Sequence, residues 1–114
     1  MIKNVLIDVD GVLWEHGKTI KGAKETLEFL EKNNYKHLIV TNMSRMTKKE
    51  LIKLIGKGNV KLHEKNILTP THATIDFVKS KKKNPTCFLV ASPNIKKEFK
   101  KFGVMVVENE KADF

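Results

Sequence analysis

Two carboxylates stand two residues apart near the start of the chain, at the end of a short apolar run over residues 5–9. Positions two apart on an extended strand share a face, and a turn at Gly11 can bring both Asp8 and Asp10 to the strand tip. Carboxylates held together repel each other unless a cation or proton intervenes, and Mg²⁺ is the natural partner because it prefers oxygen ligands. A plain Asx-type turn is the alternative. An EF-hand calcium loop fits poorly, because the glycine falls too early and the bidentate Glu is missing.

A second pair of polar residues, Thr41 and Asn42, follows another apolar run at residues 37–40. In an open α/β sheet, ligands bind beyond the carboxyl ends of the strands, where the chain passes into the following helices. A threonine hydroxyl, backbone N–H groups and the positive end of the next helix suit an anion. Taken alone, this pair is also a plausible turn.

The positions of apolar residues predict strands that alternate with helices, which is typical of an α/β three-layer domain with a mainly parallel sheet. The first two strands have the separation of a strand-helix-strand crossover and should be parallel neighbours, with both faces of the first strand buried. At 114 residues we expect one domain with a single core. The predicted strands are 5–9, 37–40, 86–91 and 104–107, and the predicted helices are 22–33, 48–56, 70–83 and 93–102, with Thr47, Thr69 and Ser92 as N-caps.

The net charge is +9, and lysine supplies it almost alone, since Arg45 is the only arginine. Arginine is the usual reader of guanine edges, so this composition argues against sequence-specific nucleic-acid binding. The lysines suit a solvated surface, or a positive potential that attracts phosphorylated substrates.

The single cysteine, Cys87, excludes an intramolecular disulfide within the chain and lies in an apolar run, where a buried inert thiol is expected. Neither a signal-length apolar stretch nor a run of about 20 apolar residues for a membrane helix occurs in the sequence. We therefore expect a cytoplasmic protein without membrane contact.

Taken together, these segments resemble the haloacid dehalogenase (HAD) superfamily, in its NagD-like or 4-nitrophenylphosphatase-like branch. Residues 6–13, Leu-Ile-Asp-Val-Asp-Gly-Val-Leu, are similar to the first motif of that family, and residues 41–45, Thr-Asn-Met-Ser-Arg, to the second, with Met43 in place of a second Asn. Lys21-Gly22-Ala23 is similar to the Pro-Gly-Ala signature that follows the flap of the branch. Residues 67–74 and 112–114 also resemble segments of the branch. The resemblance covers the whole chain and implies a Rossmann-like HAD core.

The resemblance implies phosphoryl transfer in two steps. Asp8 would attack phosphorus to form an aspartyl-phosphate, and Asp10 would act as acid toward the leaving group and then as base toward water. Mg²⁺ would be bound by the Asp8 carboxylate and the Asp10 carbonyl. The phosphate-binding residues would be Val9, Asp10, Thr41 and Asn42, and the substrate a small phosphorylated metabolite.

The same resemblance also implies parts that the 114 residues do not supply: a cap domain, the last core strands, a lysine in a third motif and an acidic Gly-Asp fourth motif. Residues 1–114 would then be the N-terminal portion of a HAD-like core domain. We expect the isolated chain to be weakly active or inactive, because these groups stabilise the transition state electrostatically. The alternatives are a non-catalytic phosphate-binding or assembly subunit and one half of a split phosphatase, completed by a homo-oligomer or by a complementing C-terminal chain.

Overall fold

The computed structural model describes residues 1–108 and 111–114, and its contacts divide the chain into two compact units. The first unit comprises residues 1–42 and 48–68, and the second comprises residues 43–47 and 69–114. This division differs from the single core expected from the length, because the buried side chains of the second unit form a cluster of their own.

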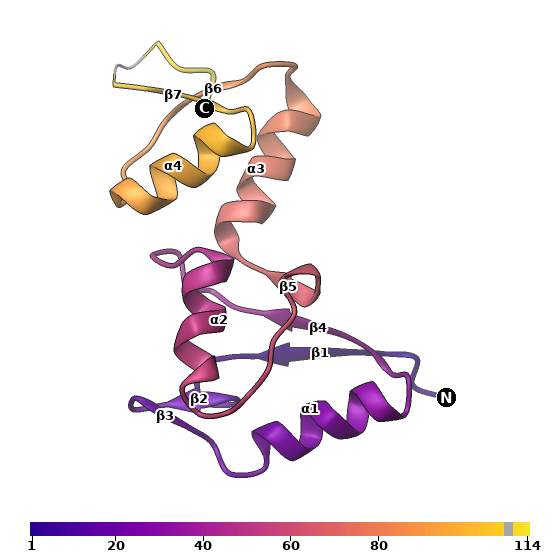
Figure 1. Cartoon of the computed structure of the whole chain (residues 1–114). Coiled ribbons are helices and arrows are strands. Elements are labelled where there is room, and N and C mark those ends of the chain that lie inside the picture. Colours follow the sequence, from indigo (N-terminus) through magenta and orange to yellow (C-terminus); the bar gives the residue numbers. More distant parts are fainter. Residues whose placement is uncertain (109–110) are drawn as a thin grey trace. The chain divides into compact units, whose positions relative to one another are not determined.

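The first unit is built on a three-stranded parallel sheet in the order β1-β4-β5 (Figure 1). Strand β1 is Asn4–Asp8, β4 is Lys36–Val40 and β5 is Ile67–Leu68. The predicted crossover between the first two strands is confirmed, with Asn4 opposite Lys36 and Asp8 opposite Val40. Strand β5 was not predicted, because two residues are too few to show a strand pattern.

Helices α1 (Ala23–Lys32) and α2 (Lys48–Gly56) have the predicted amphipathic spacing. Helix α1 buries Ala23, Leu27 and Leu30, and the chain leaves it through Asn34, which has a positive φ of 57°. A short 3₁₀ turn, Glu64–Asn66, precedes β5. The side chains that α2 buries are Leu51 and Ile55.

The prediction that both faces of β1 are buried is wrong for the described residues. Ile7 is 9% exposed, whereas its neighbour Leu6 is 72% exposed. Successive side chains on a strand point to opposite faces, so the face of β1 that carries Ile7 is covered and the face that carries Leu6 is not. The opposite face and the outer edge of β1 are open within the first unit.

A small antiparallel hairpin of β2 (Trp14–Glu15) and β3 (Lys18–Thr19) follows β1. Its two turn residues, His16 and Gly17, have φ values of 47° and 79°. Positive φ at both central residues is the mark of a type I′ turn, whose twist matches that of the strands it joins. This hairpin occupies the place of the predicted flap.

The second unit contains two helices and a separate two-stranded parallel sheet (Figure 1). Its elements are α3 (Pro70–Lys81), β6 (Thr86–Phe88), α4 (Pro93–Lys101) and β7 (Met105–Val107). Both proline starts are confirmed. The predicted cap at Thr69 is also confirmed, because its hydroxyl accepts a hydrogen bond from the His72 amide, 3.3 Å away. Ser92 occupies the N-cap position of α4, but its side chain makes no capping bond.

The core of the second unit includes the one cysteine, whose predicted burial is confirmed. Burial, together with the negative charge of Asp113, raises the pKa of the Cys87 thiol. A thiol of this kind is a poor nucleophile. The buried cluster consists of Ile75, Val78, Cys87, Ile95, Phe99 and Val104.

In the described residues, every helix is too short or too polar to cross a membrane.

Candidate active site at the carboxyl ends of β1 and β4

The parallel register of β1 and β4 brings the two predicted polar segments to one edge of the sheet. Asp8 lies opposite Val40. The residues that follow each of them, Val9 and Asp10 on one side and Thr41 and Asn42 on the other, therefore leave neighbouring strands at the same end. The juxtaposition proposed from the sequence is present in the first unit.

The turn after β1 is held by the backbone of Val9, which is completely buried. Its carbonyl accepts hydrogen bonds from the amides of Val12, Leu13 and Trp14 at 3.2, 2.9 and 3.0 Å. The Gly11 amide donates to the Trp14 carbonyl at 2.9 Å, and Gly11 has a φ of 75°, which favours glycine. Asp10 sits within this hydrogen-bonded turn with an exposed side chain, so its position is fixed by backbone and not by packing.

The Asp8 carboxylate is oriented by the chain itself. Its Oδ1 accepts a hydrogen bond from the amide of Val9 at 2.7 Å, while the residue as a whole is exposed. A carboxylate oxygen has further lone pairs, so this bond orients Asp8 and leaves it able to accept others. The Val9 amide, which the resemblance assigns to phosphate, donates to Asp8 in this structure.

Thr41 and Asn42 differ in their surroundings. Thr41 is 6% exposed, and its amide donates to the Leu68 carbonyl at 3.2 Å, so the chain after β4 remains tied to β5. Asn42 is exposed. The anchoring role of Leu68 could not be predicted from the sequence, because a carbonyl is common to every residue type.

Among the described residues, no three His, Cys, Asp or Glu side chains gather closely enough to form a metal site. The donors at this edge are oxygens, from the carboxylates of Asp8 and Asp10 and from backbone carbonyls. Such a set fits Mg²⁺, which needs few protein ligands because it keeps several waters, and it does not fit a nitrogen- or sulfur-preferring metal.

In the hairpin after β1, Trp14 is 8% exposed and packs into the first unit. His16 is exposed at the hairpin turn. The buried indole at the base of the hairpin contributes to the core of the first unit.

The match to a family model now defines the class of protein. Residues 5–105 match the model of the haloacid dehalogenase-like hydrolases, and the chain belongs to this family.

Known proteins narrow the resemblance to one branch. An acid sugar phosphatase from Staphylococcus haemolyticus is 25% identical over 112 residues, which are 98% of this chain and 43% of that protein. NagD from Escherichia coli K-12 superposes with a TM-score of 0.87 at 26% identity, over 99% of this chain and 44% of NagD. A 4-nitrophenylphosphatase from Thermotoga maritima gives a TM-score of 0.88 at 24% identity, over 99% and 43%. The NagD-like resemblance and the α/β fold class are confirmed, and the chain spans less than half the length of these relatives.

Proposed function

We propose that this chain supplies the nucleophile and the acid–base carboxylate of a Mg²⁺-dependent phosphomonoester hydrolase. The observation that supports the proposal is the parallel register of β1 and β4, in which Asp8 lies opposite Val40 and residues 9–10 and 41–42 follow neighbouring strand ends. This edge of the sheet would then offer a nucleophile, a second carboxylate and hydrogen-bond donors for an oxyanion. Phosphoryl transfer through a covalent intermediate needs these three kinds of group.

In the proposed reaction, an oxygen of the Asp8 carboxylate attacks phosphorus and the bond to the leaving oxygen breaks. Asp10, acting as general acid, gives a proton to that leaving oxygen. The resulting aspartyl-phosphate is hydrolysed when Asp10 takes a proton from water, whose oxygen bonds to phosphorus and releases Asp8. The hydrogen bond from the Val9 amide orients the attacking carboxylate.

Phosphoryl oxygens would be held by the Thr41 hydroxyl and by the backbone amides of Asp10 and Asn42, with the Val9 amide available when it leaves Asp8. The buried, backbone-tied position of Thr41 supports this role, because a fixed donor costs little reorganisation during the reaction.

Mg²⁺ would be held by the Asp8 carboxylate and the Asp10 carbonyl, and when bound it would screen the charge between the nucleophile and the phosphate. The oxygen donors at this edge suit the ion. A glycerol phosphate phosphatase from Mycobacterium tuberculosis, which shares the fold at a TM-score of 0.83 and 17% identity, has been solved in complex with magnesium.

The substrate class we propose is a small phosphorylated metabolite, such as a sugar phosphate. The name of the Staphylococcus relative supports this choice, and so does the net charge of +9, which attracts anions. We also propose a cytoplasmic location, on the sequence grounds given above.

The test is hydrolysis of 4-nitrophenyl phosphate by the purified chain, with and without Mg²⁺, beside Asp8→Asn and Asp10→Asn. We expect turnover to be very weak in the 114 residues alone, to require the metal, and to fall by at least about a hundredfold in Asp8→Asn. Full turnover in Asp8→Asn would show that Asp8 is not the nucleophile. A rate in the wild type that does not respond to Mg²⁺ or to either substitution would reject the proposal.

A second candidate is an assembly function, as a split half or a non-catalytic subunit, and the open side of β1 supports it. Leu6 is 72% exposed on a strand whose outer edge has no partner among the described residues. An open strand edge can pair with another chain. We propose that a second copy or a complementing chain covers it. The mass in solution separates these cases, since a strictly monomeric chain at high concentration would exclude self-pairing and leave only a different partner.

A further inference from the structure

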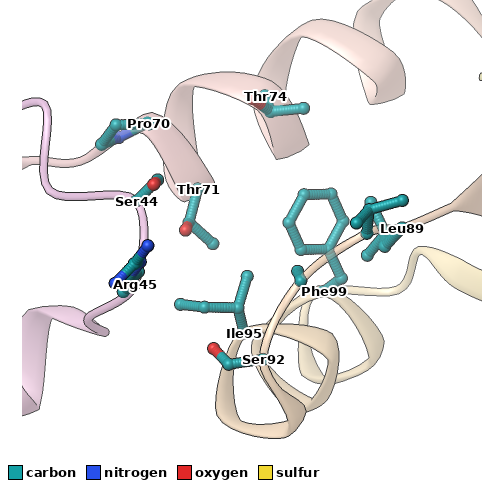
Figure 2. A pocket seen from close by; sticks show the side chains of 11 residues that line it. Ser44, Arg45, Pro70, Thr71, Thr74, Leu89, Ser92, Ile95 and Phe99 are labelled. Atoms are coloured by element: carbon teal, nitrogen blue, oxygen red, sulfur yellow. The ribbon is translucent and has the colours of Figure 1, made fainter.

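The second unit contains a cavity whose lining includes none of the residues used in the proposed reaction. Its volume is about 530 Å³, within the range of small-molecule sites. The loop 43–47, the start of α3, the segment after β6 and helix α4 surround it (Figure 2). All eleven lining residues belong to the second unit.

One end of this cavity is polar and carries a positive charge. Arg45, the only arginine of the chain, lines it together with Ser44 and Thr71. In Figure 2 the hydroxyl oxygen of Thr71 points into the space on the side where Arg45 lies. The Arg45 backbone is fixed there, because the Asn94 side chain on α4 donates from Nδ2 to the Arg45 carbonyl at 3.1 Å. This bond fixes the backbone from which the side chain extends, and a guanidinium can bind an oxyanion through two N–H groups.

The Ser92 hydroxyl at the N-terminus of α4 lacks a hydrogen-bond partner among the described residues. Less than 1 Å² of its Oγ is exposed, and this atom makes no hydrogen bond within the described part of the chain. Buried hydroxyls almost always have a partner. Ser92 is also the N-cap residue of the nine-residue helix α4, yet its side chain makes no capping bond. The hydroxyl is therefore left over at a helix end whose partial charge is positive.

The other end of the cavity is apolar. Ile95 and Phe99, each 3% exposed, form it with Leu89 (Figure 2). None of the lining residues is acidic. A ligand that satisfies both ends has an anionic head and an apolar body.

We propose that this cavity binds a small organic anion, with its oxyanion head between the Arg45 guanidinium and the Thr71 hydroxyl, and its apolar body against Ile95 and Phe99. The head is a carboxylate or a tetrahedral phosphorus oxyanion, two groups that share this chemistry. The proposal does not depend on phosphoryl transfer at Asp8, since it uses a different set of residues.

The test is a titration of the isotope-labelled chain followed through its backbone amide NMR signals. The probes are 3-phenylpropionate, benzylphosphonate and the neutral 3-phenylpropan-1-ol, none of which a phosphatase can hydrolyse. We expect saturable shifts in residues 44–45, 71–74 and 91–95, with a Kd of about 1 mM or tighter for at least one acid and binding at least about tenfold weaker for the alcohol. Comparison of the two acids identifies the preferred head.

Two variants test whether the positive charge of Arg45 binds the acids. Arg45→Gln should weaken binding of the acids by about tenfold or more, whereas Lys97→Gln, which removes an exposed cation of α4 outside the cavity, should leave the Kd unchanged. Both substitutions are at exposed positions, and the spectra show whether each variant is folded. Equal binding of the acids and the alcohol, equal binding by Arg45→Gln and the wild type, or no saturable shift up to about 20 mM of any probe would overturn the proposal.

Discussion

Asp113 and Thr86 hold each other through both backbone and side chains. The Asp113 Oδ2 accepts hydrogen bonds from the Thr86 amide at 2.9 Å and from the Thr86 hydroxyl at 2.8 Å. In return, the Asp113 amide donates to the Thr86 Oγ1 and to the Thr86 carbonyl, both at 3.0 Å. Lys82 pairs with the other carboxylate oxygen. This network ties residues 113–114 to β6.

The acid stability of the second unit should depend on this carboxylate. The hydrogen bond from Lys82 and those from Thr86 lower the pKa of Asp113 from 3.8 to about 2. Because the pKa in the folded state is depressed, the stabilisation is fully present above pH 3.8 and is lost as the pH falls through about 2. Thermal unfolding of the wild type and Asp113→Asn should therefore differ most above pH 4 and converge toward pH 2. Asp76→Asn, at an exposed site on α3, is the control, and a gap for Asp113→Asn that stays constant with pH would contradict the assignment.

Gly58 should tolerate no side chain, because Thr19 of the hairpin fills the space. A Cβ at Gly58 would overlap the Thr19 Oγ1 and come within 2.7 Å of the Thr19 Cβ, whereas one at Gly56 would meet nothing within 4 Å. Gly58→Ala should cost about 1–3 kcal/mol in the free energy of unfolding. Gly56→Ala should be neutral or stabilising by up to about 1 kcal/mol, because it reduces the entropy of the unfolded chain. Chemical denaturation of the two variants measures both effects, and equal effects would count against the contact.

Thr69 should contribute to stability as a helix cap, whereas Ser92 should not. The Thr69 hydroxyl accepts a hydrogen bond from the His72 amide, whereas the Ser92 side chain makes no capping bond in α4. Thr69→Ala should lower the free energy of unfolding by about 1 kcal/mol, and Thr69→Ser should retain most of it. Ser92→Ala is the matched control and should change stability by less than about 0.5 kcal/mol. A larger loss in Ser92→Ala than in Thr69→Ala, measured by urea unfolding, would refute the comparison.

Leu6 and Ile7 are neighbours on β1 with opposite surroundings. Ile7→Ala should cost about 2–5 kcal/mol, because it leaves a cavity in the core of the first unit. Leu6→Ala should cost little in a monomer, since its side chain is 72% exposed. If a second copy covers this face, the wild type gains more stability than Leu6→Ala as the protein concentration rises. The difference in stability between the two proteins then increases with concentration. Unfolding curves at two protein concentrations decide between these outcomes.

The sequence was sufficient to predict every helix, because capping residues and apolar spacing are local signals. Thr69 followed by Pro70 marked the start of α3, and the positions of Leu27 and Leu30 marked the buried face of α1. The juxtaposition of Asp8 with Thr41 followed from the crossover rule for parallel strands.

What could not be predicted depends on contacts between distant residues. The exposure of Leu6 is decided by which elements cover β1, and the two-residue strand β5 is defined by its parallel pairing with β4. The uncapped state of Ser92 and the separate sheet of β6 and β7 also have no local signature. Residue type alone does not report such pairings.

The assignment of residues 43–47 to the second unit has a consequence for any attempt to divide the chain. The polypeptide passes from one unit to the other between residues 42 and 43, between 47 and 48, and between 68 and 69. No single cut therefore yields two intact pieces. A fragment of residues 69–114 would lack the loop that Asn94 holds through the Arg45 carbonyl, and a fragment of residues 1–68 would carry that loop without its anchor. The two units are interleaved along the chain and are not interchangeable modules.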